Sequence, residues 1–109
     1  MSGYFVLKQS GTQYMFNLKA GNHETVLTSE RYTTKQSAQG GIASVQQNAA
    51  HDERFKKSTA KDGSMYFTLT AGNGESLGRS EMYPTAAARD KGIAAVKTAA
   101  VNAPTKEGT

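Results

Sequence analysis

The residues with the clearest capacity for chemistry occur in a motif that the chain repeats. Ser-Glu-x-Tyr occupies residues 29–32 and again residues 80–83. If the fold brings both copies together, the carboxylates and phenols could hold a small cationic or polar ligand between them. These candidate ligand contacts are Glu30, Tyr32, Glu81 and Tyr83. We favour a structural role, in which serine and glutamate satisfy N–H groups at a helix start while tyrosine packs beside it.

Neither catalytic nor metal-binding sets are predicted. The chain has no cysteine, which excludes disulfides and thiolate metal ligands. His23 and His51 have no second ligand three or four residues away, so we expect no metal and no cofactor. The stretch GNGESLG (72–78) lies between two expected strands, which indicates a hairpin turn and not a dinucleotide-binding loop. We therefore predict no catalytic residues and no enzyme activity, with chemistry at the Glu/Tyr pairs as the alternative.

The charge of the chain is compatible with a polyanionic partner. The formal net charge is +4 and the isoelectric point is near 9.4, and a basic stretch at 54–61 includes Lys56 and Lys57. Together with Phe5 and Tyr66, which could stack on bases, these side chains support an alternative function as a weak nucleic-acid-binding protein. Acidic residues bracket the basic stretch and no nucleic-acid-binding motif is present, so this hypothesis ranks second.

The elements that position these residues are duplicated. Sliding the sequence on itself by 51 positions aligns residues 4–49 with 55–100 without a gap, and 15 of the 46 aligned pairs are identical. A match of this extent in one register predicts a tandem duplication. We divide a single domain (1–109) into repeat one, a linker (50–54), repeat two and a loose C-terminal tail (101–109).

Each repeat has the periodicity of three strands. YMFNLKA and MYFTLTA alternate apolar and polar residues, as strands with one buried face do. YFVLK is a short β-rich run, whereas its counterpart FKKST is polar enough to predict a strand at a sheet edge. The expected strands lie at 4–8, 14–20 and 24–30 in repeat one and at 55–59, 65–71 and 75–81 in repeat two.

A helix closes each repeat. Thr34 and Thr85 can cap the two helix N-termini. The apolar stripe of the first helix comprises Ala38, Ile42, Val45 and Ala49, and the second keeps Ile93, Val96 and Ala100. One β-β-β-α unit cannot bury both its sheet face and its helix stripe, so the two must share a core. We predict an α+β fold in which two tandem repeats, related by pseudo-two-fold symmetry, form one antiparallel sheet of about six strands with two helices on one face.

The other face of the sheet is expected to be open. Five apolar residues have the parity opposite to the inward set, namely Phe5, Leu7, Met15, Leu27 and Tyr66. Apolar residues that gather on a solvated face can form a contact patch. Scattered surface apolar residues, or cover by the C-terminal tail, are the alternatives. Exchange of a strand between the repeats is also compatible with the pattern.

The repeated phrases resemble those of a known family. FNLKAGN, SERYTT and GGIASV in repeat one, and FTLTAGN, SEMYPT and KGIAAV in repeat two, are similar to the YegP-like family of small bacterial domains of unknown function. The resemblance covers about residues 4–100. It implies a duplicated β-β-β-α unit around one sheet, and it implies no activity and no catalytic residues. The polar first strand of repeat two departs from the family pattern.

Together these patterns favour a small, non-enzymatic binding or assembly module that acts through its open sheet face or the groove between repeats. We expect a protein partner first and nucleic acid second, and a monomer with an internal pseudo-dimer. The N-terminal sequence has no basic leader followed by an apolar run, and no apolar stretch approaches the ~18 residues of a spanning helix. We therefore expect no signal peptide, no membrane association and a cytoplasmic location.

Overall fold

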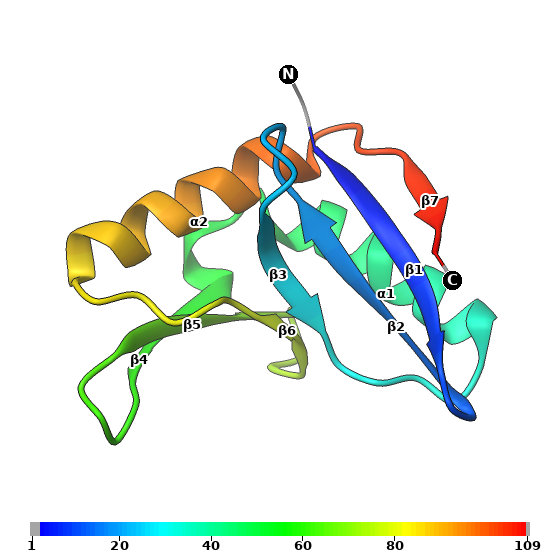
Figure 1. Cartoon of the computed structure of the whole chain (residues 1–109), viewed down its shortest axis with the longest axis horizontal. Coiled ribbons are helices and arrows are strands. Elements are labelled where there is room, and N and C mark those ends of the chain that lie inside the picture. Colours follow the sequence, from blue (N-terminus) through cyan, green and yellow to red (C-terminus); the bar gives the residue numbers. More distant parts are fainter. Residues whose placement is uncertain (1–2, 109) are drawn as a thin grey trace.

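Strands and helices follow one another in the order that the repeat predicts, with one strand added at the end (Figure 1). The computed structural model describes residues 3–108. Its strands are β1 (Tyr4–Ser10), β2 (Gln13–Lys19), β3 (Thr25–Ser29), β4 (Phe55–Thr59), β5 (Met65–Thr70), β6 (Ser76–Arg79) and β7 (Thr105–Glu107). Its helices are α1 (Lys35–Asn48) and α2 (Ala86–Ala100), and a 3₁₀ turn (Asp52–Arg54) follows α1. Apart from β7, each half of the chain is β-β-β-α.

The strands form one mixed sheet in the order β4-β5-β6-β3-β2-β1-β7. Neighbouring strands are antiparallel except β1 and β7, which are parallel. The α+β class is as predicted, but the purely antiparallel sheet of about six strands is wrong, because a seventh strand joins in parallel. The strands of each half stay together, and the halves meet where β3 pairs with β6. The polar strand β4 lies at a sheet edge, as its composition predicts.

The segment that we expected to be a loose tail (101–109) is bound to the first half, as far as the structure describes it. The N–H of Phe5 donates to the carbonyl of Pro104 at 2.8 Å, and the N–H of Gly108 donates to the carbonyl of Leu7 at 2.7 Å. An uncovered β1 would present a row of unpaired backbone groups at the sheet edge. Because β7 satisfies these groups, the tail is part of the sheet.

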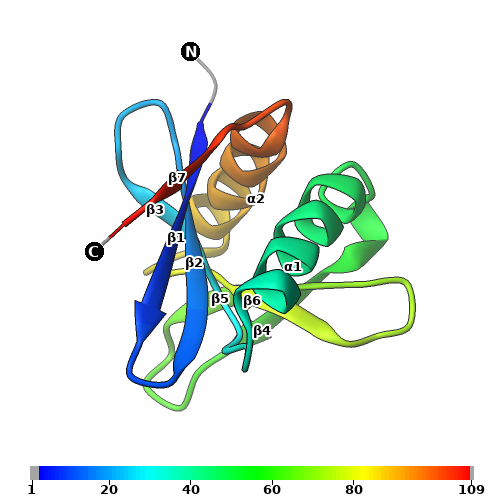
Figure 2. The same cartoon turned by 90° about the vertical axis from the view of Figure 1, so that its right-hand side faces the viewer.

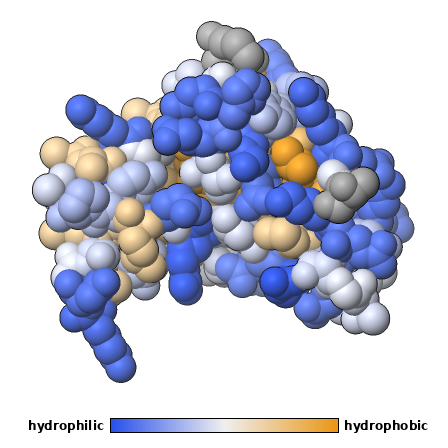
Figure 3. Space-filling view, in the orientation of Figure 1, coloured by the Kyte–Doolittle hydropathy of each residue, from blue (hydrophilic) through white to orange (hydrophobic). Residues whose placement is uncertain are grey.

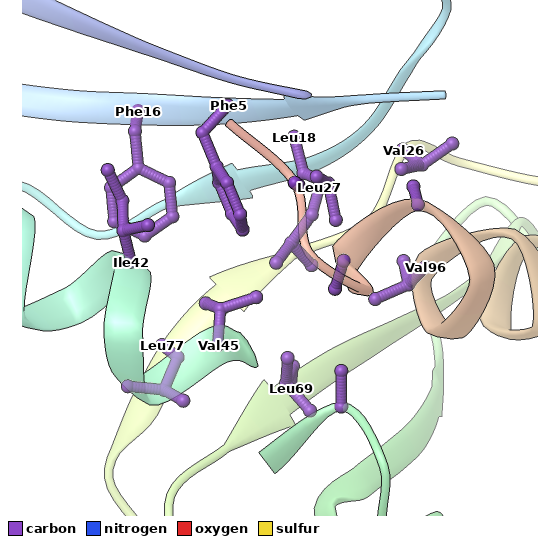
Figure 4. Packing of buried hydrophobic residues seen from close by; sticks show 14 of the residues in the cluster. Phe5, Phe16, Leu18, Val26, Leu27, Ile42, Val45, Leu69, Leu77 and Val96 are labelled. Atoms are coloured by element: carbon purple, nitrogen blue, oxygen red, sulfur yellow. The ribbon is translucent and has the colours of Figure 1, made fainter. Parts of the chain in front are cut away.

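Both helices pack on the same side of the twisted sheet (Figure 2). The largest fully buried side chains come from both layers and both halves: Phe5, Phe16, Leu18, Leu27, Val45, Phe67, Leu69 and Val96. In Figure 4, Phe5 and Phe16 point from their strands toward Ile42 of α1. The two halves therefore bury their apolar faces in one interior.

Phe5, Leu7 and Leu27, which we expected on the outward face, lie in this interior with 0%, 3% and 0% of their surface exposed. The pairing of strands explains the error. Phe5 lies opposite Leu18 and Leu7 opposite Phe16, so these side chains share a face. A register shift after Leu18 places Leu27 opposite Leu18 as well.

The helix starts are those that the sequence predicts. The hydroxyl of Thr34 accepts the N–H of Ser37 at 3.0 Å, and that of Thr85 accepts the N–H of Ala88 at 3.1 Å. The predicted stripe of α1 is buried in full, and in α2 Val96 and Ala100 are buried while Ile93 is half-buried. No helix within residues 3–108 has the length and apolar character that crossing a membrane requires.

Candidate functional site

The serines of the repeated motif stabilise the sheet. Ser29 Oγ accepts the backbone N–H of Phe16 at 2.8 Å and donates to the carbonyl of Glu30 at 2.7 Å. Ser80 makes the equivalent two bonds in the second half, at 2.9 and 2.8 Å. Both serines are buried. Each serine hydroxyl thus supplies the hydrogen-bond acceptor that the neighbouring strand needs where β3 or β6 ends. The expected serine contact with a helix start is wrong.

Replacing Ser29 with alanine should lower the free energy of unfolding by about 1–2 kcal/mol, because the buried N–H of Phe16 loses its acceptor. Glu30→Gln should change it by less than about 0.5 kcal/mol, because the side chain is exposed. Urea denaturation of both variants measures the difference. A cost for Glu30→Gln as large as that for Ser29→Ala would show that the carboxylate contributes to stability as much as the hydroxyl does.

The tyrosines of the motif pack against helix glycines. The ring of Tyr32 stacks on Phe16 with centroids 6.2 Å apart and planes at 12°. A Cβ atom on Gly41 would lie 2.3 Å from the Tyr32 hydroxyl. Tyr83 repeats the arrangement, with a centroid distance of 6.5 Å and a distance of 2.3 Å to the position of a Cβ on Gly92. The missing side chains of these glycines thus let the tyrosine rings lie directly against the helix backbone.

The structure does not gather the four predicted motif residues into one site. A cavity of about 430 Å³ is lined by Glu30 and Tyr32 together with Glu75 of the β5–β6 turn, and it contains neither Glu81 nor Tyr83. Burial raises the pKa of Tyr32 above its usual value, and the charges of Glu30 and Glu75 raise it further. Burial and two carboxylates raise the pKa of Tyr83 in the same way. Each tyrosine therefore stays protonated and uncharged at neutral pH.

The outward face of the sheet carries a row of residues that are polar or basic except for Val6. Paired positions run from edge to edge through Lys106, Val6, Asn17, Thr28, Arg79, Thr68 and Lys56. The next row contains Phe5, Leu18 and Leu27, which are buried under the helices. Because side chains alternate along a strand, the row from Lys106 to Lys56 points away from the helices.

Charge on this face has one sign. The outward-facing basic residues of the strands are Lys8, Lys19, Lys56, Arg79 and Lys106. Of the nine acidic residues in the sequence, all within the described part of the chain, only Glu107 lies in a strand. Glu107 pairs with Leu7 of the buried row and bonds to Lys35 of α1 at 2.7 Å. In the orientation of Figure 1, the surface is largely hydrophilic, with several separate apolar areas (Figure 3).

Two of the predicted nucleic-acid contacts lie on the open face and two do not. Lys56 and Tyr66 are on adjacent strands of that face. Phe5 is in the core and cannot stack on a base. Lys57 faces the helices, where its Nζ lies 3.2 Å from a carboxylate oxygen of Asp90. Alternation along the strand separates the two neighbouring lysines onto opposite faces.

Cations lie over both tyrosines of this face. The guanidinium carbon of Arg79 is 5.3 Å from the ring centroid of Tyr66, and Nζ of Lys106 is 4.6 Å from that of Tyr4. A cavity of about 350 Å³ opens at the seam between β3 and β6, and its charged lining residues are Arg79, Arg31 and Glu30. We call this surface, defined by its five outward-facing strand cations, Tyr4 and Tyr66, the basic sheet face.

The sequence patterns indicated Lys19 on this face, but not Lys8, Arg79, Lys106 or Tyr4. A signal was available for the first strand, because a two-residue turn at Gly11-Thr12 pairs Phe5 with Leu18 and so turns Tyr4 and Lys8 outward. Nothing local marks Lys106, which joins the face only through β7. Within residues 3–108 no three His, Asp or Glu side chains gather in a way that could hold a metal ion.

Comparison with known proteins identifies close relatives. The family model described as Domain of unknown function (DUF1508) matches residues 9–55 and again residues 60–107. A UPF0339 protein of Bordetella pertussis is 72% identical over 109 residues, which cover 100% of this chain and 98% of the relative. UPF0339 protein YegP of Escherichia coli K12 is 50% identical over 110 residues, with 100% of each chain covered.

Solved structures of similar proteins have the same fold. The solution NMR structure of yegP from E. coli, a protein of unknown function, superposes with a TM-score of 0.94 at 49% identity, covering 100% of this chain and 95% of that one. That of a UPF0339 protein from Shewanella oneidensis gives 0.91 at 44% identity, covering 98% and 92%. Both structures share the sheet and helices described above, and neither protein's name assigns it an activity.

Proposed function

We propose that this chain, which belongs to the DUF1508 family of domains of unknown function, is a non-enzymatic module that binds single-stranded nucleic acid on its basic sheet face. The observation that carries the proposal is the separation of charge. Basic side chains cross the open face from β7 to β4, while the carboxylates lie in turns, in helices or toward α1. A surface of one sign attracts a polyanion and gains affinity as phosphates release their counterions.

The aromatic residues favour a single strand over a duplex. Tyr4 and Tyr66 are half-buried on the open face, each with a cation over its ring. Bases of a single strand are free to stack on such rings, and sheet-borne aromatic residues with nearby cations suit this mode of binding. The rigid sheet holds both tyrosines in place before binding, so little conformational entropy is lost.

An apolar contact with a protein partner, our first expectation from the sequence, has lost most of its support. Of the five residues proposed for that patch, Phe5, Leu7 and Leu27 belong to the core. Met15 and Tyr66 are left, and the second of these lies beneath Arg79. A face of this composition recognises charge better than it recognises an apolar surface.

We also propose that the two halves are related by a pseudo-two-fold axis and that the chain acts as a monomer with an internal pseudo-dimer. Thr28 of β3 pairs with Arg79 of β6, and these two residues occupy equivalent positions of the repeats. The bonds of Ser29 and Ser80 and the stacking of Tyr32 and Tyr83 occur once in each half. Such an axis passes through the β3–β6 seam and the cavity beside it.

Binding of a fluorescent single-stranded oligonucleotide at about 50 mM and at about 200 mM salt tests the nucleic-acid proposal. Lys56→Gln should weaken binding and reduce the slope of log K against log salt by about 0.7, the value for one phosphate of a single strand. Lys57→Gln is the matched control, because it removes the same charge from the opposite face. Tyr66→Ala should cost about 1–3 kcal/mol of binding free energy.

Equal effects of Lys56→Gln and Lys57→Gln would show that only net charge matters, which contradicts a defined binding face. Absence of binding at the lower salt concentration to either single-stranded or duplex oligonucleotides would end the proposal. Stronger binding to the duplex would overturn the part of it that depends on stacking.

A further inference from the structure

We propose that a cleft on the helix side of the molecule binds the oxyanion group, carboxylate or phosphate, of a small molecule through Arg54. The cleft has a volume of about 390 Å³ and lies between the last turns of α1 and the β5–β6 turn. Its polar walls include Ser44, Gln47, Asn48, His51 and Arg54. Figure 2 shows α1, the segment that follows it and the β5–β6 turn on one side of the molecule. This site is separate from the basic sheet face.

One nitrogen of the partly buried Arg54 side chain has no hydrogen-bond partner within the described residues. Its Nε is buried without a hydrogen bond, and the side chain has no ion pair with any of the residues from 3 to 108. The guanidinium lies over Gly72, where a Cβ atom would be 3.4 Å from Nη2. Arg89 has a similar buried Nε, but Asp90 lies 3.6 Å from it. The guanidinium of Arg54 is thus available to pair with an anionic group that enters the cleft.

The duplication supplies an internal comparison. The equivalent cleft beside α2, of about 300 Å³, is lined mainly by small residues, among them Ala20, Ala95 and Ala99. Ser44 and Asn48 occupy the positions of Ala95 and Ala99, and Arg54 that of a glycine, Gly3. The same backbone therefore packs with alanine at these positions, so the fold does not require the polar lining. The amide of Asn48 donates to the carbonyl of Ser44 at 2.8 Å, so within this lining the group left without a hydrogen bond is Nε of Arg54.

The chemistry of the lining selects an anion. A guanidinium presents paired donors that match the two oxygens of a carboxylate or phosphate. The amide of Gln47 and the imidazole of His51 add donors on the same cleft, and no carboxylate lines it. A structural alternative is that Arg54 compensates the free carbonyls at the C-terminal end of α1. However, its side chain donates no hydrogen bond to a carbonyl within the described residues.

Titration of the ¹⁵N-labelled full chain with inorganic phosphate and, separately, with acetate tests the site at constant ionic strength. We expect saturable shifts of the Gly72 and Asn73 amide signals and of the Arg54 Nε–H signal. Arg54→Gln should weaken binding about tenfold or more, whereas Lys91→Gln in the equivalent cleft should leave it unchanged. The anion that saturates at the lower concentration identifies the preferred ligand group.

Thermal melting gives a second readout. The preferred anion should raise the melting temperature of the wild type and of Lys91→Gln but not that of Arg54→Gln. Shifts that persist in Arg54→Gln would overturn the proposal, as would the absence of a saturable shift with both anions. Loss of stability in Arg54→Gln without any effect of anions on the wild type would assign Arg54 the structural role.

Discussion

Gly78→Leu, a change that makes the second repeat more like the first, is expected to destabilise the protein by about 3 kcal/mol or more. Gly78 occupies the position of Leu27, and both lie at the β3–β6 seam. A Cβ atom on Gly78 would lie 2.8 Å from the carbonyl oxygen of Thr28 and 3.0 Å from Cγ of Leu27. The carbonyl belongs to the backbone and cannot move aside without disturbing the ladder. The seam therefore has room for one large side chain, not for two.

Exchanging the two residues should recover only the part of the loss that comes from the Leu27 side chain. Leu27→Gly alone removes a fully buried side chain and should cost about 3–5 kcal/mol. In the double variant the contacts of the new leucine with the Leu27 side chain are gone, while the contact of its Cβ with the Thr28 carbonyl remains, so the combined cost should be below the sum of the single costs by the side-chain part alone. Urea denaturation of the four proteins measures the coupling. Additive costs would contradict the pseudo-two-fold relation of the halves.

Alanine should have opposite effects at two neighbouring glycines of α1. Gly41→Ala should destabilise the protein by about 2–3 kcal/mol, because the new methyl group would lie 2.3 Å from the hydroxyl of Tyr32 and 3.1 Å from Cε2 of Phe16. The tyrosine cannot withdraw easily, since its backbone N–H and carbonyl both bond to Tyr14 at 2.7 Å. Gly40→Ala should stabilise the protein by up to about 1 kcal/mol, because no atom lies within 4 Å of the new methyl group.

Thermal or chemical unfolding of the two variants gives the sign directly. A second substitution, Tyr32→Leu, should reduce the cost of Gly41→Ala, because it removes the hydroxyl that the methyl group meets. Stabilisation by Gly41→Ala would mean that the tyrosine ring does not rest on the helix. That result would contradict the packing role that we assign to the tyrosine of the repeated Ser-Glu-x-Tyr motif.

Local patterns predicted much of the fold because they report interactions between near neighbours. The helices begin at Thr34 and Thr85 because a threonine hydroxyl can cap the helix that follows it. The polar strand β4 was expected at a sheet edge, because a strand with neighbours on both sides is less accessible to water than an edge strand. The glycine-rich stretch 72–78 could be distinguished from a nucleotide-binding loop because it joins two strands, β5 and β6, and does not lead into a helix.

The face to which each strand residue points was harder to predict. Alternation alone divides a strand into two sets without saying which set is inward, and β1 carries apolar residues in both. Phe5 was assigned outward by counting along the chain, although pairing across the two-residue turn places it beside Leu18. This correction also changes the candidate site, because Tyr4 and Lys8, and not Phe5 and Leu7, lie on the outward face.

Spacing along the chain was enough to predict three features of this protein. These are the two similar halves, the order of elements in each half and the residues at which each helix starts. Only the tertiary structure decided that β7 joins β1, that Lys56 and Lys57 serve opposite faces, and that Arg54 and Gly72 meet in a cleft. These features depend on contacts between segments far apart in the chain. Such contacts form because the backbone groups of a sheet edge need hydrogen-bond partners and because charged groups need either solvent or an opposite charge.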